Sequence, residues 1–233
     1  MKTVKNILFF DLETAGVNAL KSDLGFILMV GYKWSHEKTA KVLTIKKKHL
    51  KHFDDKALLT AFSKIYTKAD LTVAHFGSVF DRRMFQGRLL INQLPPIPPT
   101  LMRDTCIIAR SVANFSSNRL NNLGNTLKLS NRKMEKGDGW PGWWFGAMQG
   151  NMQSIREMAA YCKRDVEALE ELYYRLRPFD NAHPRMTVNR DKCGSCGGDV
   201  EYRGYRYAKT LRYARYQCLE PSCQKWGQGR SAA

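Results

Sequence analysis

Short runs of hydrophobic residues recur along the first half of the chain, each bounded by polar or turn-forming residues. Runs of this length that are rich in β-branched and aromatic residues are typical of strands. The first three runs are close enough in sequence to pair as consecutive antiparallel strands. The pattern predicts strands over residues 7–14, 25–34, 41–45, 71–74 and 101–104.

Between and after these runs, the hydrophobic residues recur with the period of a helix. Leu58, Phe62 and Tyr66, for example, fall on one helix face, and Pro178 ends the last helical stretch. The segment 136–150 is rich in Gly and Trp and is predicted to be a loop. Helices are predicted over about 54–68, 80–92, 105–113, 117–129 and 152–176.

Strands that come first and then alternate with helices indicate a mixed sheet with helices on its faces. With 233 residues, the chain is long enough for one sizeable domain and a small one. We therefore predict an α/β domain over residues 1–177, a linker over 178–191 and a small C-terminal domain over 192–228.

The charge of the chain indicates its partner. Lys and Arg number 38 against 21 Asp and Glu, which gives a formal net charge of +17. A surplus of this size indicates a polyanion, most commonly nucleic acid. No apolar stretch approaches the ~20 residues of a membrane helix, and the start of the sequence has no signal-peptide pattern. We expect a cytoplasmic protein without a membrane partner, in the host cytoplasm if it is phage-encoded.

Two acidic residues lie at the end of the first apolar run. Asp11 and Glu13 are two positions apart, so both side chains point to the same side of a strand. Like charges held this close repel, and burial strengthens the repulsion. A hard divalent cation with oxygen ligands would relieve it, so the pair indicates half of a metal site. For the pair taken alone, a solvated strand end is the alternative.

Three further residues are candidates for the same site. Asp81 begins a helix after a short strand, and Tyr161 and Asp165 are four apart on one face of the last helix. Each also has a structural explanation. A helix dipole would stabilise Asp81 at a helix start. Asp165 would form an ion pair with a nearby basic side chain. Tyr161 would be a core residue with a solvated hydroxyl.

Three ordered motifs resemble those of a known family. Residues 10–14 (FDLET), 74–81 (AHFGSVFD) and 161–165 (YCKRD) are similar to the motifs of the DEDD exonucleases. These enzymes are the DnaQ-like group of the ribonuclease-H-like superfamily. A Tyr four residues before the last Asp marks the DEDDy branch, whereas the histidine branch has His at the position of Ala160.

The resemblance covers about residues 3–177 and implies a metal-dependent 3′-to-5′ exonuclease that releases nucleoside 5′-monophosphates. Many relatives have Asn where this sequence has Phe76, and Phe cannot make the same polar contact with substrate. Two other functions stay open: a non-catalytic nucleic-acid-binding protein, and an endonuclease that acts on structured or branched substrates. The intact set of acidic residues argues against the first of these.

The same resemblance implies two Mg²⁺ or Mn²⁺ ions. Asp11 would bridge the ions, and Glu13 and Asp165 would complete the first site. Asp81 would support the second ion, directly or through water. Two such ions activate a water and stabilise the leaving 3′ oxygen. Tyr161 would orient the attacking water, because an ordinary tyrosine pKa of about 10 makes it a poor base.

Four of the six cysteines form two closely spaced pairs near the C-terminus. Cys193 and Cys196 are three positions apart, Cys218 and Cys223 are five apart, and 21 residues separate the pairs. In an intracellular protein this spacing indicates a zinc site, and disulfides are the alternative. The segment 192–228 resembles a zinc ribbon, a small hairpin domain that needs one structural Zn²⁺ to stay folded.

The predicted hairpin alternates basic and aromatic residues. Basic side chains suit phosphates and rings suit bases, so we expect nucleic-acid contact; a structural cap is the alternative. Single-stranded DNA or a 3′ end is the favoured partner, RNA stays open, and a role in replication or repair would add a protein partner. The residues expected to make contact are Arg203, Tyr205, Arg206, Lys209, Arg212, Tyr213 and Arg215.

Two other groups of residues are interpreted as structural. Trp140, Trp143 and Trp144 are expected to pack against the last helix, with stacking on bases as the alternative. Cys106 and Cys162 lie within apolar patterns and are interpreted as ordinary buried thiols.

Overall fold

A five-stranded sheet forms the centre of the larger domain in the computed structural model, which describes residues 6–131, 142–208 and 210–232. The strand order is β3-β2-β1-β4-β5. The first three strands are antiparallel, and β1, β4 and β5 are parallel to one another. The predicted mixed α/β sheet is therefore confirmed. The strands are β1 (Ile7–Gly16), β2 (Gly25–Trp34), β3 (Lys41–Thr44), β4 (Leu71–Ala74) and β5 (Leu101–Asp104).

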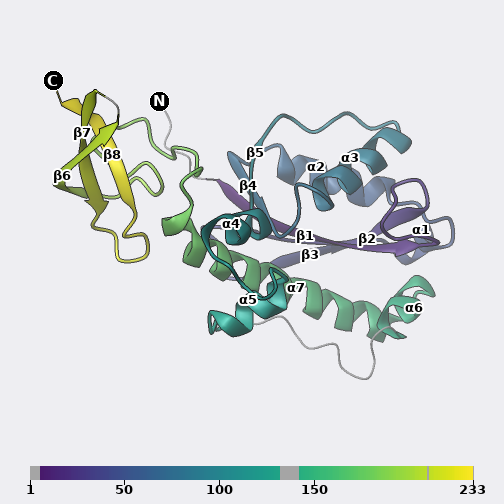
Figure 1. Cartoon of the computed structure of the whole chain (residues 1–233). Coiled ribbons are helices and arrows are strands. Elements are labelled where there is room, and N and C mark those ends of the chain that lie inside the picture. The colour runs from purple at the N-terminus through teal and green to yellow at the C-terminus, as the bar shows by residue number, and fades with distance from the viewer. Residues whose placement is uncertain (1–5, 132–141, 209, 233) are drawn as a thin grey trace.

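Helices cover both faces of the sheet (Figure 1). Helices α2 and α3 lie on one face, whereas α7 crosses the other and carries α4 and α5 beside it. Among the helices of the described segments, none has the length and apolarity that crossing a bilayer requires. The helices are α1 (Lys47–Leu50), α2 (Lys56–Tyr66), α3 (Asp81–Ile91), α4 (Thr105–Val112), α5 (Leu120–Thr126), α6 (Gly142–Met148) and α7 (Met152–Leu176).

The side chains of β1 alternate between these two layers. The ring of Phe10 lies 5.6 Å from that of Phe62 in α2, whereas the ring of Phe9 lies 5.5 Å from that of Tyr173 in α7. Both Phe side chains are fully buried. A strand that is buried on both faces has a continuous apolar sequence and not an alternation of apolar and polar residues.

Helix α1 was not predicted, and two further predictions differ from the structure. The predicted loop over 136–150 contains α6, because packing of the partly buried Trp143 and Trp144 against the core outweighs the low helix propensity of Gly. This packing agrees with the structural interpretation of these two residues, whereas Trp140 lies outside the described residues. The helix predicted over 117–129 is shortened at both ends to α5.

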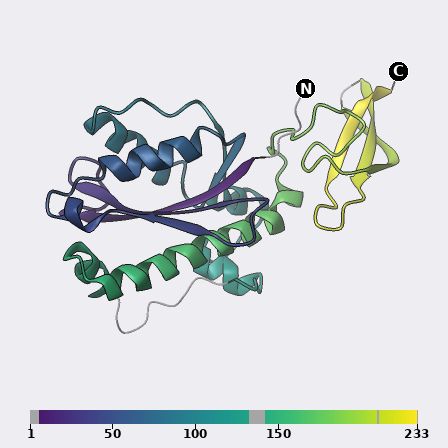
Figure 2. The same ribbon diagram turned by 180° about the vertical axis from the view of Figure 1, so that it is seen from behind.

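The C-terminal unit is a small antiparallel sheet with the order β6-β7-β8. It comprises β6 (Val200–Ala208), β7 (Leu211–Cys218) and β8 (Trp226–Ala232). The hairpin was predicted, but β8 was not, because its sequence is rich in Gly; it also extends past the predicted limit at residue 228. The unit follows the short helix η1 (Arg177–Phe179) and lies beside the end of α7 (Figure 2).

Candidate active site

The face of β1 that packs against α7 carries the first two candidate residues. Asp11 and Glu13 follow Phe9 on this face, because side chains alternate along a strand. Glu13 is buried and Asp11 is half-buried. In the described part of the chain, one oxygen from each carboxylate and Sγ of Cys162 all lie within 4.8 Å of one another. The structure therefore brings the two acidic residues together, with α7 directly against them.

Asp81 is connected to β1 from the side on which β4 pairs with this strand. Strand β4 pairs with β1 over Ile7–Phe9, and just beyond this pairing the Leu12 N–H donates a 3.0 Å hydrogen bond to Oδ1 of Asp81. Asp81 is only 3% exposed. Burial raises its pKa to about 7; the bond from Leu12 opposes this rise and the Asp104 carboxylate adds to it. A buried acidic group of this kind favours a compensating cation.

The loop that leads into α3 is anchored by Asp104 at the end of β5. Its carboxylate accepts hydrogen bonds from the main-chain N–H groups of Phe76 at 2.9 Å and Ser78 at 3.0 Å. The same carboxylate caps α4 through the N–H of Cys106 at 3.0 Å. Phe76 has a φ of 64°, a backbone conformation that Asn adopts more readily than Phe. Sequence reasoning assigned Asp104 no role, although an Asp between a strand and a helix is a capping signal.

Tyr161 and Asp165 lie on the buried face of α7. The Trp144 ring of α6 packs edge-on to the Tyr161 ring, with their centres 6.1 Å apart. The Trp144 indole N–H donates a 3.0 Å hydrogen bond to the main-chain oxygen of Thr14 in β1. Helix α6 therefore connects the acidic strand to the helix that carries Tyr161. Asp81 and Asp165 lie outside the tight cluster formed by the two acidic residues of β1.

Cys162 is the neighbour of the site that the sequence analysis missed. Gly31 pairs with Asp11 across the sheet, and a Cβ at Gly31 would lie 2.7 Å from Sγ of Cys162. The missing side chain therefore allows α7 to approach the sheet beside the acidic residues. Burial raises the pKa of the Cys162 thiol, and the carboxylates of Glu13, Asp11 and Asp165 raise it further. The sequence signal that could have placed Cys162 at the site is its position three residues before Asp165, because this spacing puts both side chains on one helix face.

The four C-terminal cysteines converge at one end of the small sheet. The Sγ atoms of Cys193 and Cys223 are 3.9 Å apart and those of Cys196 and Cys218 are 3.5 Å apart, and all four lie within 4.8 Å of one another. A disulfide would need a separation of about 2.05 Å, and all four are free thiols. Gly197, with a φ of 81°, closes the first turn by donating its N–H to the Cys193 oxygen at 2.8 Å.

The residues expected to contact nucleic acid lie on β6 and β7. Arg212 lies 4.5 Å from the centre of the Tyr205 ring, and Arg215 lies 4.9 Å from the centre of the Trp226 ring in β8. These strands therefore carry cations stacked on rings. The structure describes Arg203, Tyr205, Arg206, Arg212, Tyr213 and Arg215, whereas Lys209 lies outside the described residues.

Comparisons with known proteins identify the family of the larger domain. Residues 8–177 match the RNase_H superfamily. The fold is similar to the structure of the family B DNA polymerase from the hyperthermophilic archaeon Pyrobaculum calidifontis, with a TM-score of 0.60 and 16% identity. That similarity covers 74% of this chain and 24% of the polymerase, so the chain spans about a quarter of the polymerase's length. No curated protein matches the sequence. Because the family match spans most of the chain, this protein belongs to the RNase_H superfamily.

Proposed function

We propose that this protein is a metal-dependent 3′-to-5′ exonuclease of the DEDDy type that releases nucleoside 5′-monophosphates. The observation that carries the proposal is the hydrogen bond from Leu12 to Asp81, which joins a third carboxylate to β1 between Asp11 and Glu13. Membership of the RNase_H superfamily supports a nucleic-acid hydrolase. The finer assignment rests on the order and spacing of the acidic residues and Tyr161.

The acidic residues fit two Mg²⁺ or Mn²⁺ ions by their chemistry. Asp11 and Glu13 offer oxygen atoms within 4.8 Å of each other, and oxygen is the ligand that these ions prefer. Asp81 and Asp165 are buried acidic groups whose negative charge a cation would compensate. When bound, such a pair of ions supplies a nucleophilic hydroxide and stabilises charge on the leaving 3′ oxygen.

Each residue of the set has a distinct proposed role. Asp11 would bridge the two ions, and Glu13 and Asp165 would complete the first site. Asp81 would serve the second. Tyr161 is buried beside α6 and would hydrogen-bond the attacking water, so that the oxygen is aligned with the phosphorus. Its role would be to position this water and not to remove its proton.

The cysteine cluster is proposed to hold one structural Zn²⁺. Four sulfurs that each lie about 2.3 Å from a tetrahedral zinc are about 3.8 Å apart. The observed separations of 3.9 and 3.5 Å agree with this value. The C-terminal unit would then be a zinc ribbon whose fold depends on its metal. We propose that it assists nucleic-acid binding through the basic and aromatic residues of β6 and β7.

The proposed substrate is nucleic acid with an accessible 3′ end. The net charge of +17 favours a polyanion. The structural likeness to a DNA polymerase favours single-stranded DNA over RNA and fits a protein partner in replication or repair. RNA is the second candidate, because the net charge of +17 suits either polyanion.

Cleavage of end-labelled single- and double-stranded DNA and RNA in Mg²⁺ or Mn²⁺ tests the proposal. The Asp11→Ala/Glu13→Ala variant should cut at least about 1,000-fold more slowly than the wild type. A matched control replaces two exposed acidic residues outside the site, Asp191→Ala and Glu220→Ala, and should cut normally. Binding without cleavage in either metal would contradict the proposal, and internal cuts would favour an endonuclease.

A further inference from the structure

A groove separates the end of α7 from the C-terminal unit. Its volume is about 1110 Å³, and its walls come from α4, the segment after α5, the end of α7 and the turn between β7 and β8. Pockets for small molecules typically enclose about 300–1,000 Å³. The groove is therefore large enough for an extended ligand.

Four aromatic rings line the groove: those of Phe115, Tyr174, Phe179 and Trp226. Phe179 is 64% exposed and Trp226 is 46% exposed. Exposed rings that gather around a hollow indicate a binding surface. The Arg215 guanidinium lies 4.9 Å from the centre of the Trp226 ring, so a cation supports this ring from the small sheet.

The charged residues of the groove give it positive character. Lys128 and Arg175 line it and are exposed. Glu171, the acidic residue among the lining side chains described, accepts 2.8 Å hydrogen bonds from the main-chain N–H groups of Ser130 and Asn131, one with each carboxylate oxygen. These two hydrogen bonds partly satisfy the negatively charged carboxylate of Glu171. The groove is thus complementary to an anion that also carries flat apolar groups.

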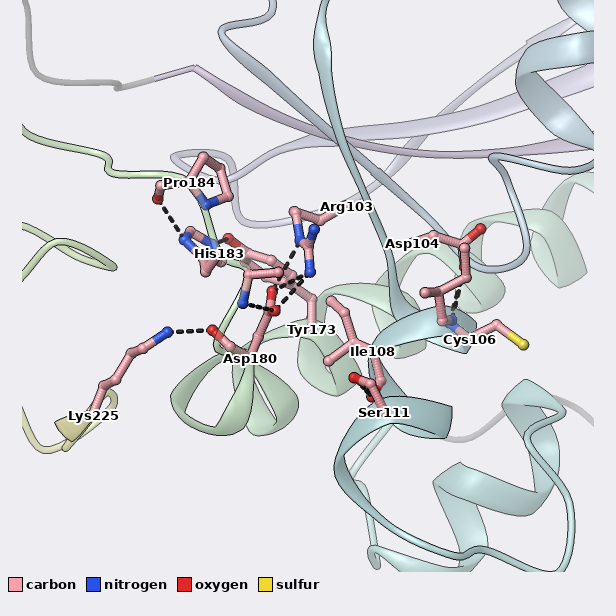
Figure 3. Close-up of polar contacts among 12 residues, drawn as sticks. Arg103, Asp104, Cys106, Ile108, Ser111, Tyr173, Asp180, His183, Pro184 and Lys225 are labelled. Carbon is pink, nitrogen blue, oxygen red and sulfur yellow. Dashed lines mark hydrogen bonds and ion pairs between the residues drawn. The ribbon is translucent and has the colours of Figure 1, made fainter. Parts of the chain in front are cut away.

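Two contacts of Asp180 connect the C-terminal unit to the larger domain beside the groove (Figure 3). The Asp180 carboxylate is buried and accepts hydrogen bonds of 2.9 and 2.6 Å from the Arg103 guanidinium of β5. The main-chain oxygen of Asp180 accepts a hydrogen bond from the ammonium group of Lys225, the residue before Trp226. The Trp226 wall is therefore attached to the larger domain, which reduces the entropy cost of binding a ligand between the walls.

We propose that this groove binds single-stranded nucleic acid upstream of the 3′ end that enters the active site. Rings that stack on bases, beside cations that contact phosphates, are the general features of sequence-independent single-strand sites. This inference rests on the proposed function. From Asp165 to Leu176, α7 rises by about 17 Å. At the 3.4 Å per nucleotide of a stacked strand this corresponds to about five nucleotides, so a strand of about three nucleotides would not reach the groove.

Cleavage of single strands of two lengths tests the proposal in the full chain. Wild-type protein should have a higher kcat/KM on a strand of about 15 nucleotides than on one of about three. The Phe179→Ala/Trp226→Ala variant should lose about 10- to 100-fold on the long strand and keep its rate on the short one. Phe53→Ala is the matched control, because Phe53 is 51% exposed and lies beside α1, at the opposite end of the larger domain.

A second variant tests the charges separately. Lys128→Glu/Arg175→Glu should weaken binding of the long strand and lower the salt dependence of binding, with a slope reduced by about 1.4 for two lost phosphate contacts. Lys51→Glu, an exposed residue next to α1, should leave the slope nearly unchanged. Fluorescence anisotropy of the labelled long strand without added Mg²⁺ or Mn²⁺ measures this binding independently of cleavage.

These two measurements distinguish the groove from the proposed function. If the wild type cuts no strand, the proposed function fails, and weaker binding by the groove variants still supports the groove. Wild-type binding by both groove variants would overturn the groove proposal, even if cleavage is observed. Equal losses on short and long strands would also overturn it, because they would indicate damage to the active site.

Discussion

The main-chain N–H of Leu12 donates a 3.0 Å hydrogen bond to Oδ1 of Asp81. This bond joins the first residue of α3 to β1 at the position between Asp11 and Glu13. Asp81 therefore has two separable properties: it accepts a structural hydrogen bond, and it contributes a negative charge to the proposed metal site. Substitutions that remove one or both of these properties should have different effects.

Asp81→Asn keeps the hydrogen-bond acceptor and removes the charge. We expect its free energy of unfolding to stay within about 1 kcal/mol of wild type, whereas Asp81→Ala should lose about 1–3 kcal/mol because the buried Leu12 N–H loses its partner. Cleavage should fall at least about 100-fold in both variants, because each removes a proposed metal ligand. Urea unfolding and a cleavage assay check the two effects. Normal cleavage by Asp81→Asn would contradict the role given to this carboxylate.

Gly31→Ala should disturb the packing of α7 beside the acidic residues. Its Cβ would meet Sγ of Cys162 at 2.7 Å, so we expect a loss of about 1–3 kcal/mol in stability. Slower cleavage should follow, because Tyr161 and Asp165 move with the helix. Adding Cys162→Ala removes the contact with Sγ and should restore part of the stability, since neighbouring substitutions are coupled. The close contact with Cγ2 of Val166 at 2.9 Å remains.

Gly124→Ala in α5 is the control for this change, because no atom lies within 4 Å of the added Cβ. It should be neutral, or stabilising by up to about 1 kcal/mol through helix propensity. If Gly31→Ala matches this control in both unfolding and cleavage, close packing at Gly31 does not determine the geometry of the site.

His183 should make stability depend on pH at the junction of the two domains. Burial lowers its pKa to about 4, and its Nε2 lies 2.7 Å from the Tyr173 hydroxyl. Below its unfolded pKa of 6.5, the unfolded chain binds a proton that the folded chain does not, so stability is lost as the pH falls from 6.5 toward 4. Near pH 5 this loss amounts to about 2 kcal/mol.

The effect of His183 is measured as a difference between two proteins. The free energy of unfolding in urea is measured for wild type and for His183→Gln near pH 7.5 and near pH 5. The difference between the two proteins removes the contributions of other titratable groups. The wild type should lose about 2 kcal/mol more than the variant on acidification. Equal losses would show that His183 titrates normally in the folded protein.

Removal of zinc should unfold the C-terminal unit and leave the larger domain folded. Protein purified without chelator should contain one Zn²⁺ per chain by elemental analysis, and Cys223→Ser should lose most of it. Cys106→Ser, at a buried cysteine outside the cluster, should retain the metal. Wild-type protein free of zinc but with an intact, protease-resistant C-terminal unit would contradict the structural role of the metal.

The sequence predicts most of the larger domain because its elements have strong local signals. The bounds of β2, β4, β5 and α7 agree with the pattern of apolar runs and the stop at Pro178. Asp11 and Glu13 were predictable as a pair because their spacing matches the strand period. The motif order also suggested Asp81 and Asp165 as further members of the site.

The other features depend on contacts between distant segments. Helix α6 has weak propensity and forms where Trp144 can reach the Thr14 oxygen and the Tyr161 ring. The contact of Cys162 with the acidic pair depends on the approach of α7 over Gly31, which no local pattern encodes. Strand β8 is stabilised by its pairing with β7 and not by the strand propensity of its own residues. The groove lies between two domains and has no sequence signature.

The direction of degradation tests the central claim most directly. A single strand labelled at its 3′ end and one labelled at its 5′ end are digested in parallel with Mg²⁺ by wild type and by Asp11→Ala/Glu13→Ala. We expect the wild type to release the 3′ label at once as a nucleoside 5′-monophosphate, while the 5′ label passes through a ladder of shortening strands; the variant should do neither. Early release of the 5′ label, internal fragments, or equal cleavage by the variant would contradict the proposed 3′-to-5′ exonuclease.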